Sequence, residues 1–274
     1  MNFSDKIQQL RARILLPSLD VLAILMWGAL LLKYRLTGQL QLLIHPNYFS
    51  LVLIAAIVLL LIGISKAWRL YSDWQNRATQ SDPQEFLGHI SLFPTGWGSS
   101  LLLLVALFGF LFSPTVLTSK MALQRGVTES LPATEIQPQA FRTQLNTESR
   151  SLIEWVRTLS AYPEPDAYAG QPAKVTGFVI HFDQLPEDII LLSRFIITCC
   201  AVDASPVGIL VRLPPNQTDF PADTWLEVAG KMTVESLPAN FQSSFQTQEL
   251  TRQLVLAAES VKKIPIPANP YEES

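Results

Sequence analysis

The first part of the chain is a succession of long apolar runs separated by short polar segments. Three of these runs approach the roughly 20 apolar residues that a helix needs to cross a bilayer. They predict membrane-spanning helices near residues 15–36, 46–66 and 97–116. The third run is the clearest, because it contains no charged residue. We therefore expect residues 1–116 to form a multi-pass membrane domain in contact with the lipid bilayer.

Two polar residues of this domain are candidates for a functional role. Asp20 lies near the start of the first run, and a carboxylate inside a span is by default a functional group. Its structural alternative is a position at the headgroup level or at the helix end. His45 precedes Pro46 at the start of the second run. It is either part of a transport path or an interfacial residue beside a helix-starting proline.

The orientation of the domain is predicted from its Lys and Arg residues, which favour the cytoplasmic side. The N-terminal tail and the loop between the second and third runs hold six of them, at positions 6, 11, 13, 66, 69 and 77. The opposite side holds four, at positions 33, 35, 120 and 125. We expect the N-terminus to be cytoplasmic and the C-terminal domain to be extracytoplasmic.

The second part of the chain begins with a predicted linker and a predicted short helix. Residues 117–146 are polar and are interrupted by Pro132 and Pro138, which is typical of a linker. From Thr147 to Tyr162, apolar residues recur at helical spacing. These residues are Leu152, Trp155, Val156 and Leu159.

From Pro172 onward the pattern changes to short β-branched runs separated by turn-forming residues. The runs are AKVTGFVIHF, IILLSRFIITCC, VGILVRL, WLEVAGKMTV and QLVLAAESVKKI. Five such strands fit a small OB-like barrel, closed or half-closed, and a sandwich is the alternative. We expect a β-rich domain over residues 147–265 that begins with the one predicted helix. Residues 266–274 are expected to be a tail without regular structure.

The composition argues against an ordinary soluble enzyme. Only 16% of the residues are charged and the mean hydropathy is +0.25, whereas soluble domains carry about 25% charged residues. Residues 1–118 hold 8 Lys and Arg against 5 Asp and Glu, a net charge of +3. Residues 119–274 hold 12 against 18, a net charge of −6. This acidic balance argues against a nucleic-acid partner, which requires clustered positive charge.

One short stretch, residues 194–208, carries the candidate chemistry. The two cysteines of the chain, Cys199 and Cys200, are adjacent there, and Asp203 follows. Neighbouring strand residues point to opposite faces, so a shared site requires the strand to end at this point. Thiolates beside a carboxylate or an imidazole could hold a Zn or Cu ion. His181 is the one imidazole of this part of the chain and completes the candidate ligand set.

These residues also have a structural interpretation. Free cysteines commonly pack as small hydrophobic residues, and Asp203 then only starts a turn. Arg194 lies among apolar strand residues and is either exposed or an ion-pair partner of Asp203 or Asp183. The sequence requires no cofactor, and a Zn or Cu ion is the one that these side chains could hold.

Common catalytic signatures are missing from the sequence. It contains no Walker loop and no GxGxxG, GxSxG or HExxH motif. We therefore expect no enzymatic activity.

Several segments of the chain resemble the YcgQ-type permease subunits of bacteria. They are IHP at 44–46, SKMALQRGV at 119–127, GFV at 177–179, RFIITCCAVDASPVGILV at 194–211 and WLEVAG at 225–230. The resemblance implies a subunit of the bacterial cell membrane that is paired with a larger polytopic permease. It supplies no substrate. The chain departs from the pattern between the second and third runs, where relatives carry a histidine-rich segment and this sequence has only His89.

The sequence therefore predicts a non-enzymatic accessory subunit of a two-component membrane permease, with the polytopic subunit as its partner. The alternative is a membrane-tethered module that handles metal ions or thiols through Cys199 and Cys200. A third hypothesis is an OB-type module that binds glycans or other oligomers.

Overall fold

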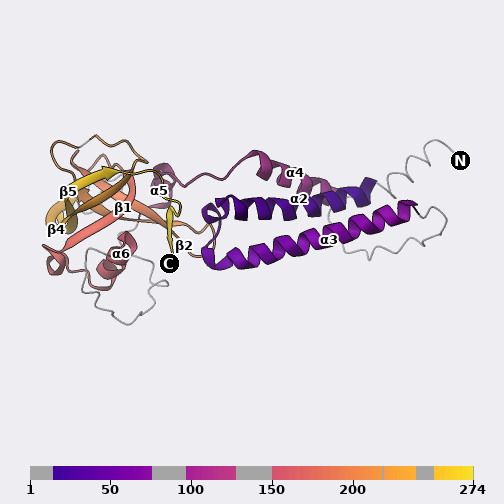
Figure 1. Cartoon of the computed structure of the whole chain (residues 1–274). Coiled ribbons are helices and arrows are strands. Elements are labelled where there is room, and N and C mark those ends of the chain that lie inside the picture. The colour runs from indigo at the N-terminus through magenta and orange to yellow at the C-terminus, as the bar shows by residue number, and fades with distance from the viewer. Residues whose placement is uncertain (1–14, 76–96, 128–149, 218, 239–249, 274) are drawn as a thin grey trace. The chain divides into compact units, whose positions relative to one another are not determined.

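The computed structural model divides the chain into two compact units, Met1–Pro114 and Thr115–Ser274 (Figure 1). The residues that it describes are 15–75, 97–127, 150–217, 219–238 and 250–273. The boundary between the units lies close to the expected end of the membrane domain at residue 116.

The described part of the first unit contains three apolar α-helices, α2 (Leu16–Leu36), α3 (Phe49–Gln75) and α4 (Trp97–Leu111). Helix α2 packs against both of the others. Helices α2 and α3 approach each other closely because glycines lie at their contact. A Cβ atom added to Gly63 would lie 2.5 Å from Cδ2 of Leu25, and one added to Gly28 would lie 2.9 Å from Cγ of Leu60. These contacts show that α2 and α3 are antiparallel.

Side chains of α2 donate hydrogen bonds to backbone carbonyls of α4. Nε1 of Trp27 lies 3.0 Å from the Leu102 oxygen, and the Tyr34 hydroxyl lies 2.8 Å from the Gly109 oxygen. Later residues of α2 thus meet later residues of α4, so these two helices are parallel. The Gly109 carbonyl belongs to the last turn of α4, whose carbonyls have no partner within the helix. Helix α2 therefore caps the C-terminal end of α4.

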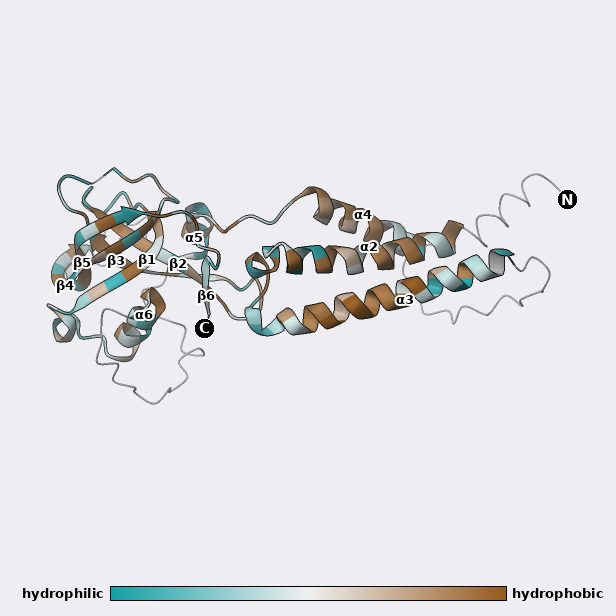
Figure 2. Ribbon diagram, in the orientation of Figure 1, coloured by the Kyte–Doolittle hydropathy of each residue, from teal (hydrophilic) through white to brown (hydrophobic). Residues whose placement is uncertain are grey.

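Two of these helices, α2 and α3, are long and apolar enough to cross a membrane. Few of their side chains are buried. Figure 2 shows long brown, hydrophobic stretches in both helices. Helix α4 is equally apolar but has only 15 residues, fewer than the roughly 20 that a span requires. Two spanning candidates are thus established, and the expected set of three is not confirmed.

The second unit contains a closed barrel of five strands. They are β1 (Pro172–Ile180), β2 (Ile189–Ile197), β3 (Ser205–Arg212), β4 (Trp225–Pro238) and β5 (Leu250–Lys263). The strand order is β1-β4-β5-β3-β2, and an additional pairing of β1 with β2 closes the sheet. Strands β3 and β5 are parallel, and the other neighbours in the barrel are antiparallel. The expected barrel is confirmed, and the sandwich alternative is wrong.

Helix α6 (Leu152–Ala161) contributes to the core of the barrel. Its start is fixed by a capping box, in which Ser151 and Glu154 each accept a hydrogen bond from the other's backbone N–H. Trp155 and Val156 are fully buried in one cluster with inward-facing strand residues. The four residues whose spacing predicted the helix all belong to this cluster or pack against it.

Strand β4 bends around the barrel through an irregularity between Ala229 and Gly230. A Cβ atom on Gly230 would lie 2.0 Å from the backbone oxygen of Ala257, so only glycine fits there.

Two segments differ from the expectations for the linker and the tail. Helix α5 (Ser119–Arg125) lies within the expected linker 117–146 but packs against β1 and β3, with Ala122 fully buried. Strand β6 (Tyr271–Glu273) lies within the expected tail and pairs in parallel with the end of β2. Both segments are part of the folded unit, because tertiary contacts stabilise elements that are too short to be recognised from local pattern.

Candidate functional site

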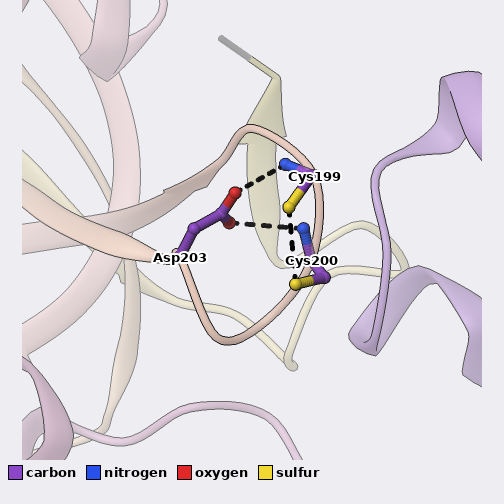
Figure 3. A group of neighbouring side chains, drawn as sticks. All are labelled: Cys199, Cys200 and Asp203. Carbon is purple, nitrogen blue, oxygen red and sulfur yellow. Dashed lines mark hydrogen bonds between the residues drawn. The ribbon is translucent and has the colours of Figure 1, made fainter.

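The candidate chemistry lies in the loop that joins β2 to β3. Strand β2 ends at Ile197, and Cys199 and Cys200 follow after Thr198, as the turn-forming residues predict. Ligand atoms of Cys199, Cys200 and Asp203 all lie within 4.8 Å of one another. Figure 3 shows the two sulfur atoms facing each other, with the Asp203 carboxylate directed at the backbone of the dicysteine. The sequence-predicted pair and its acidic neighbour therefore come together at the strand end.

The Asp203 carboxylate organises the loop by accepting hydrogen bonds from three successive backbone N–H groups. The distance from its oxygens is 2.7 Å to the nitrogen of Cys199, 3.3 Å to that of Cys200 and 3.4 Å to that of Thr198. The backbone N–H of Asp203 in turn donates to the Cys200 oxygen at 3.1 Å. One residue thereby fixes both the turn and the backbone that carries the thiols.

Both cysteines are free thiols, and they differ from packed core cysteines. Cys199 is exposed and Cys200 is half-buried. Their sulfur atoms are 3.5 Å apart, well beyond the roughly 2.05 Å of a disulfide bond. The interpretation of Cys199 as a small hydrophobic packing residue is therefore wrong.

The protonation of the loop follows from its hydrogen bonds. The Asp203 side chain, and then the Cys200 thiol, raise the pKa of Cys199 to about 12, because both favour the protonated thiol. Partial burial acts to raise the pKa of Asp203, but hydrogen bonds from the Cys199 thiol and the loop backbone outweigh it and lower that pKa. At neutral pH the loop thus holds a thiol at Cys199 and a carboxylate at Asp203.

Arg125 holds the loop from helix α5. Its Nη1 and Nη2 atoms each lie 3.3 Å from the Ala201 oxygen, and Nη1 also donates to the Ala204 oxygen. Arg125 lies in the segment 117–146 that was expected to be a linker, so its contact with the loop was not predicted. The SKMALQRGV segment that contains it was already among those that carry the family resemblance, and this was the available signal.

The C-terminal strand β6 supports the end of β2 beside the loop. Tyr271 is buried, packs edge-on against Phe195 and accepts a hydrogen bond from the Leu117 backbone N–H at 3.3 Å. Burial raises the pKa of Tyr271, although the Leu117 hydrogen bond opposes this. Arg194 donates to the Asn269 oxygen at 2.8 Å and lies over the Trp225 ring. Arg194 therefore binds the C-terminal segment.

His181 does not join the cysteines, contrary to the expected ligand set. Strands β1 and β2 are antiparallel, with Ile180 opposite Leu191, so His181 lies near the beginning of β2 and Cys199 after its end. The Nε2 atom of His181 lies 2.8 Å from the Phe220 oxygen. The imidazole therefore belongs to the opposite end of the strand pair.

The two candidates of the first unit have structural partners. Asp20 accepts a hydrogen bond from the Ser99 hydroxyl in the first turn of α4. His45 is buried and caps a short 3-10 helix (Pro46–Tyr48) by accepting the Asn47 N–H at 3.2 Å. The helix-starting role of Pro46 is thereby confirmed.

The structure thus defines a class of protein in which a unit of apolar helices is linked to a closed barrel. The barrel carries a dicysteine loop at the end of one strand. The chain belongs to the DUF1980 family. Residues 19–128 match the DUF1980 N-terminal domain, and residues 129–272 match the DUF1980 C-terminal domain. No curated protein matches the chain.

Proposed function

We propose that this chain is a non-enzymatic accessory subunit of a two-component permease in the bacterial cell membrane. The proposal rests above all on the exposure of large apolar side chains along α3 and α4. Leu51, Leu61 and Phe108 are 63%, 62% and 56% exposed. An apolar surface of this kind requires lipid or a partner protein to cover it. The YcgQ-type resemblance favours a larger polytopic subunit as that partner.

The proposal treats α4 as a third membrane span. Asp20 of α2 binds Ser99 at the start of α4, and Nζ of Lys33 lies 3.2 Å from the Phe110 oxygen at its end. Helix α4 therefore accompanies α2 over the whole stretch between these two charges. A carboxylate at the N-terminal end of a helix and an ammonium group at its C-terminal end both favour the helix dipole.

The distribution of charge supports an accessory role and not a complete transporter. Asp20 and Lys33 form hydrogen bonds at the two ends of α4. No Asp, Glu, Lys or Arg occurs from Leu36 to Ser65. Transporters build a polar path from charged or unwound segments in repeated helix bundles. The path for a polar solute would accordingly lie mainly in the partner subunit.

The barrel supports a binding role and not a catalytic one. Its strand order, with β3 parallel to β5, is OB-like, and its interior is filled by apolar side chains such as Val179 and Leu192. The excess of six over four Lys and Arg residues favours an orientation with this barrel outside the cytoplasm and the N-terminus inside.

Site-specific photo-crosslinking in native membranes tests the proposed partner. A benzophenone amino acid at the exposed Phe108 position should form an adduct with a polytopic membrane protein of defined mass. The same group at Ala106, which is 0% exposed, is the matched control and should give no such adduct.

Purification in mild detergent gives an independent readout. The tagged chain should retain the crosslinked polytopic protein in a fixed ratio. Recovery of the chain as a lone monomer, together with equal crosslinking at Phe108 and Ala106, would contradict the accessory-subunit proposal.

A further inference from the structure

We propose that the loop between β2 and β3 is a Zn²⁺-binding site, with Cys199 and Cys200 as thiolate ligands and Asp203 as a carboxylate ligand. The site adds a chemical function to the barrel that membrane anchoring and partner binding do not require. It rests only on residues of the second unit, so it stands or falls independently of the permease partner.

The spacing of the two sulfur atoms suits a shared tetrahedral ion. Two thiolates that each lie about 2.3 Å from one tetrahedral Zn²⁺ are about 3.8 Å apart. The Cys199 and Cys200 sulfur atoms are 3.5 Å apart, so a small rotation of either side chain brings both to an ion. A carboxylate oxygen within 4.8 Å of both sulfur atoms supplies the third ligand.

The mixture of ligands favours zinc over the other common metal ions. Two thiolates bind soft or borderline ions and disfavour Mg²⁺ and Ca²⁺, which prefer oxygen ligands throughout. The carboxylate is a harder ligand than Cu(I) prefers, whereas Zn²⁺ accepts sulfur, nitrogen and oxygen ligands. The donor set therefore points to Zn²⁺.

The loop is held in place before any ion binds. Arg125 binds the carbonyls of Ala201 and Ala204, and the Asp203 backbone closes the turn on Cys200. Ile196 pairs with Ser205 across the base of the loop, and β6 pairs with the last residues of β2. Supporting contacts of this kind keep ligands in position and reduce the ordering that binding requires.

Three ligands leave one position of a tetrahedral ion open. Structural zinc sites are closed by four protein ligands, whereas sites that exchange a ligand keep a position free. Cys199 is exposed, so the open position is accessible from solvent. The fourth position is therefore open to water or to a ligand from solvent, in contrast to a closed structural zinc site.

The test uses the reduced full-length chain in detergent, without any partner. One equivalent of Zn²⁺ is added, loosely bound ion is removed by desalting, and zinc is measured by elemental analysis. We expect about one zinc per chain. With Co²⁺ as the probe, we expect thiolate-to-cobalt charge-transfer absorption in the near ultraviolet, which reports sulfur ligation directly.

The variants C199S and C200S should each lose the charge-transfer band or most of its intensity. D203N should keep the band, since both thiolates remain, but it should bind the ion more weakly because the carboxylate ligand is lost. H181A is the matched control and should behave as the wild type, because His181 lies at the other end of the strand pair.

Circular dichroism separates loss of the site from loss of the fold. C199S should remain folded, since Cys199 is exposed. Wild-type protein that retains no zinc, or a C199S/C200S double variant that retains as much as the wild type, would overturn the proposal. Either result leaves the crosslinking test of the permease partner unaffected, so the two proposals can fail separately.

Discussion

At the scale of single residues, the second unit depends on a few side chains that join distant parts of the chain. Trp155 connects α6 to the barrel core, Arg125 connects α5 to the dicysteine loop, and Tyr271 connects the C-terminal strand to β2. Each is separated in sequence from the residues that it contacts. Their roles therefore become visible only once the barrel is assembled.

Replacement of Trp155 by Ala should destabilise the barrel by about 3–5 kcal/mol, because it leaves a large cavity at a fully buried position. The free energy of unfolding, measured by urea titration with near-ultraviolet circular dichroism, reports this change. V202A is the control, since Val202 is 85% exposed and its truncation should change stability by no more than about 0.5 kcal/mol. Equal stabilities of the two variants would show that α6 is not part of the core.

Tyr271 predicts a loss of stability at alkaline pH. Burial raises the pKa of Tyr271 above the ordinary value of about 10, so the folded state favours the protonated phenol. Its contribution is complete below pH 10, the unfolded value, and declines as the pH rises through the folded value. Urea midpoints between pH 8 and pH 11, measured for the wild type and Y271F, should converge or cross above about pH 10. A constant difference over this range would contradict the prediction.

At the scale of elements, regular patterns were predicted well and short elements were not. The runs beginning at Ala173, Ile189, Val207, Trp225 and Gln253 all correspond to strands of the barrel. Alternating or continuous apolar residues identify such strands because burial and local pattern agree. Helix α5 has seven residues and β6 has three, and both owe their structure to contacts with the barrel.

Part of the candidate site was likewise predictable from local sequence pattern. The position of the dicysteine after a strand follows from turn-forming residues close to it in sequence. The exclusion of His181 depends on the antiparallel pairing of β1 with β2, and the support from Arg125 depends on a segment 76 residues away from Ala201. Long-range pairing of this kind is not encoded in local pattern.

Helices α2 and α4 should crosslink in the register that their hydrogen bonds define. In a C199S/C200S background, cysteines at Trp27 and Leu102 should be joined by a short bismaleimide in membranes. A pair at Trp27 and Leu111 is the control, because position 111 lies about 13 Å further along the helix. Crosslinking is detected after proteolysis as a change in the electrophoretic mobility of a fragment. Equal crosslinking of both pairs would refute the parallel arrangement.

At the scale of the whole molecule, the proposed orientation has the N-terminus in the cytoplasm and the barrel outside the cell membrane. A membrane-impermeant maleimide applied to intact cells should label V202C, in the exposed loop, in a C199S/C200S background. It should label S81C, in the loop between the second and third apolar runs, only after the cells are lysed. The reverse result would invert the orientation inferred from the Lys and Arg distribution.

Helix α5 has a consequence for how this protein can be recombined. The match to the N-terminal family domain ends at residue 128, yet α5 folds with the barrel. A chimera joined at 128/129 would combine the Arg125 of one parent with the dicysteine loop of another. A junction after Pro114 would keep them together. Exchanges between relatives should therefore yield folded barrels when the junction follows Pro114, and a lower melting temperature when it follows residue 128.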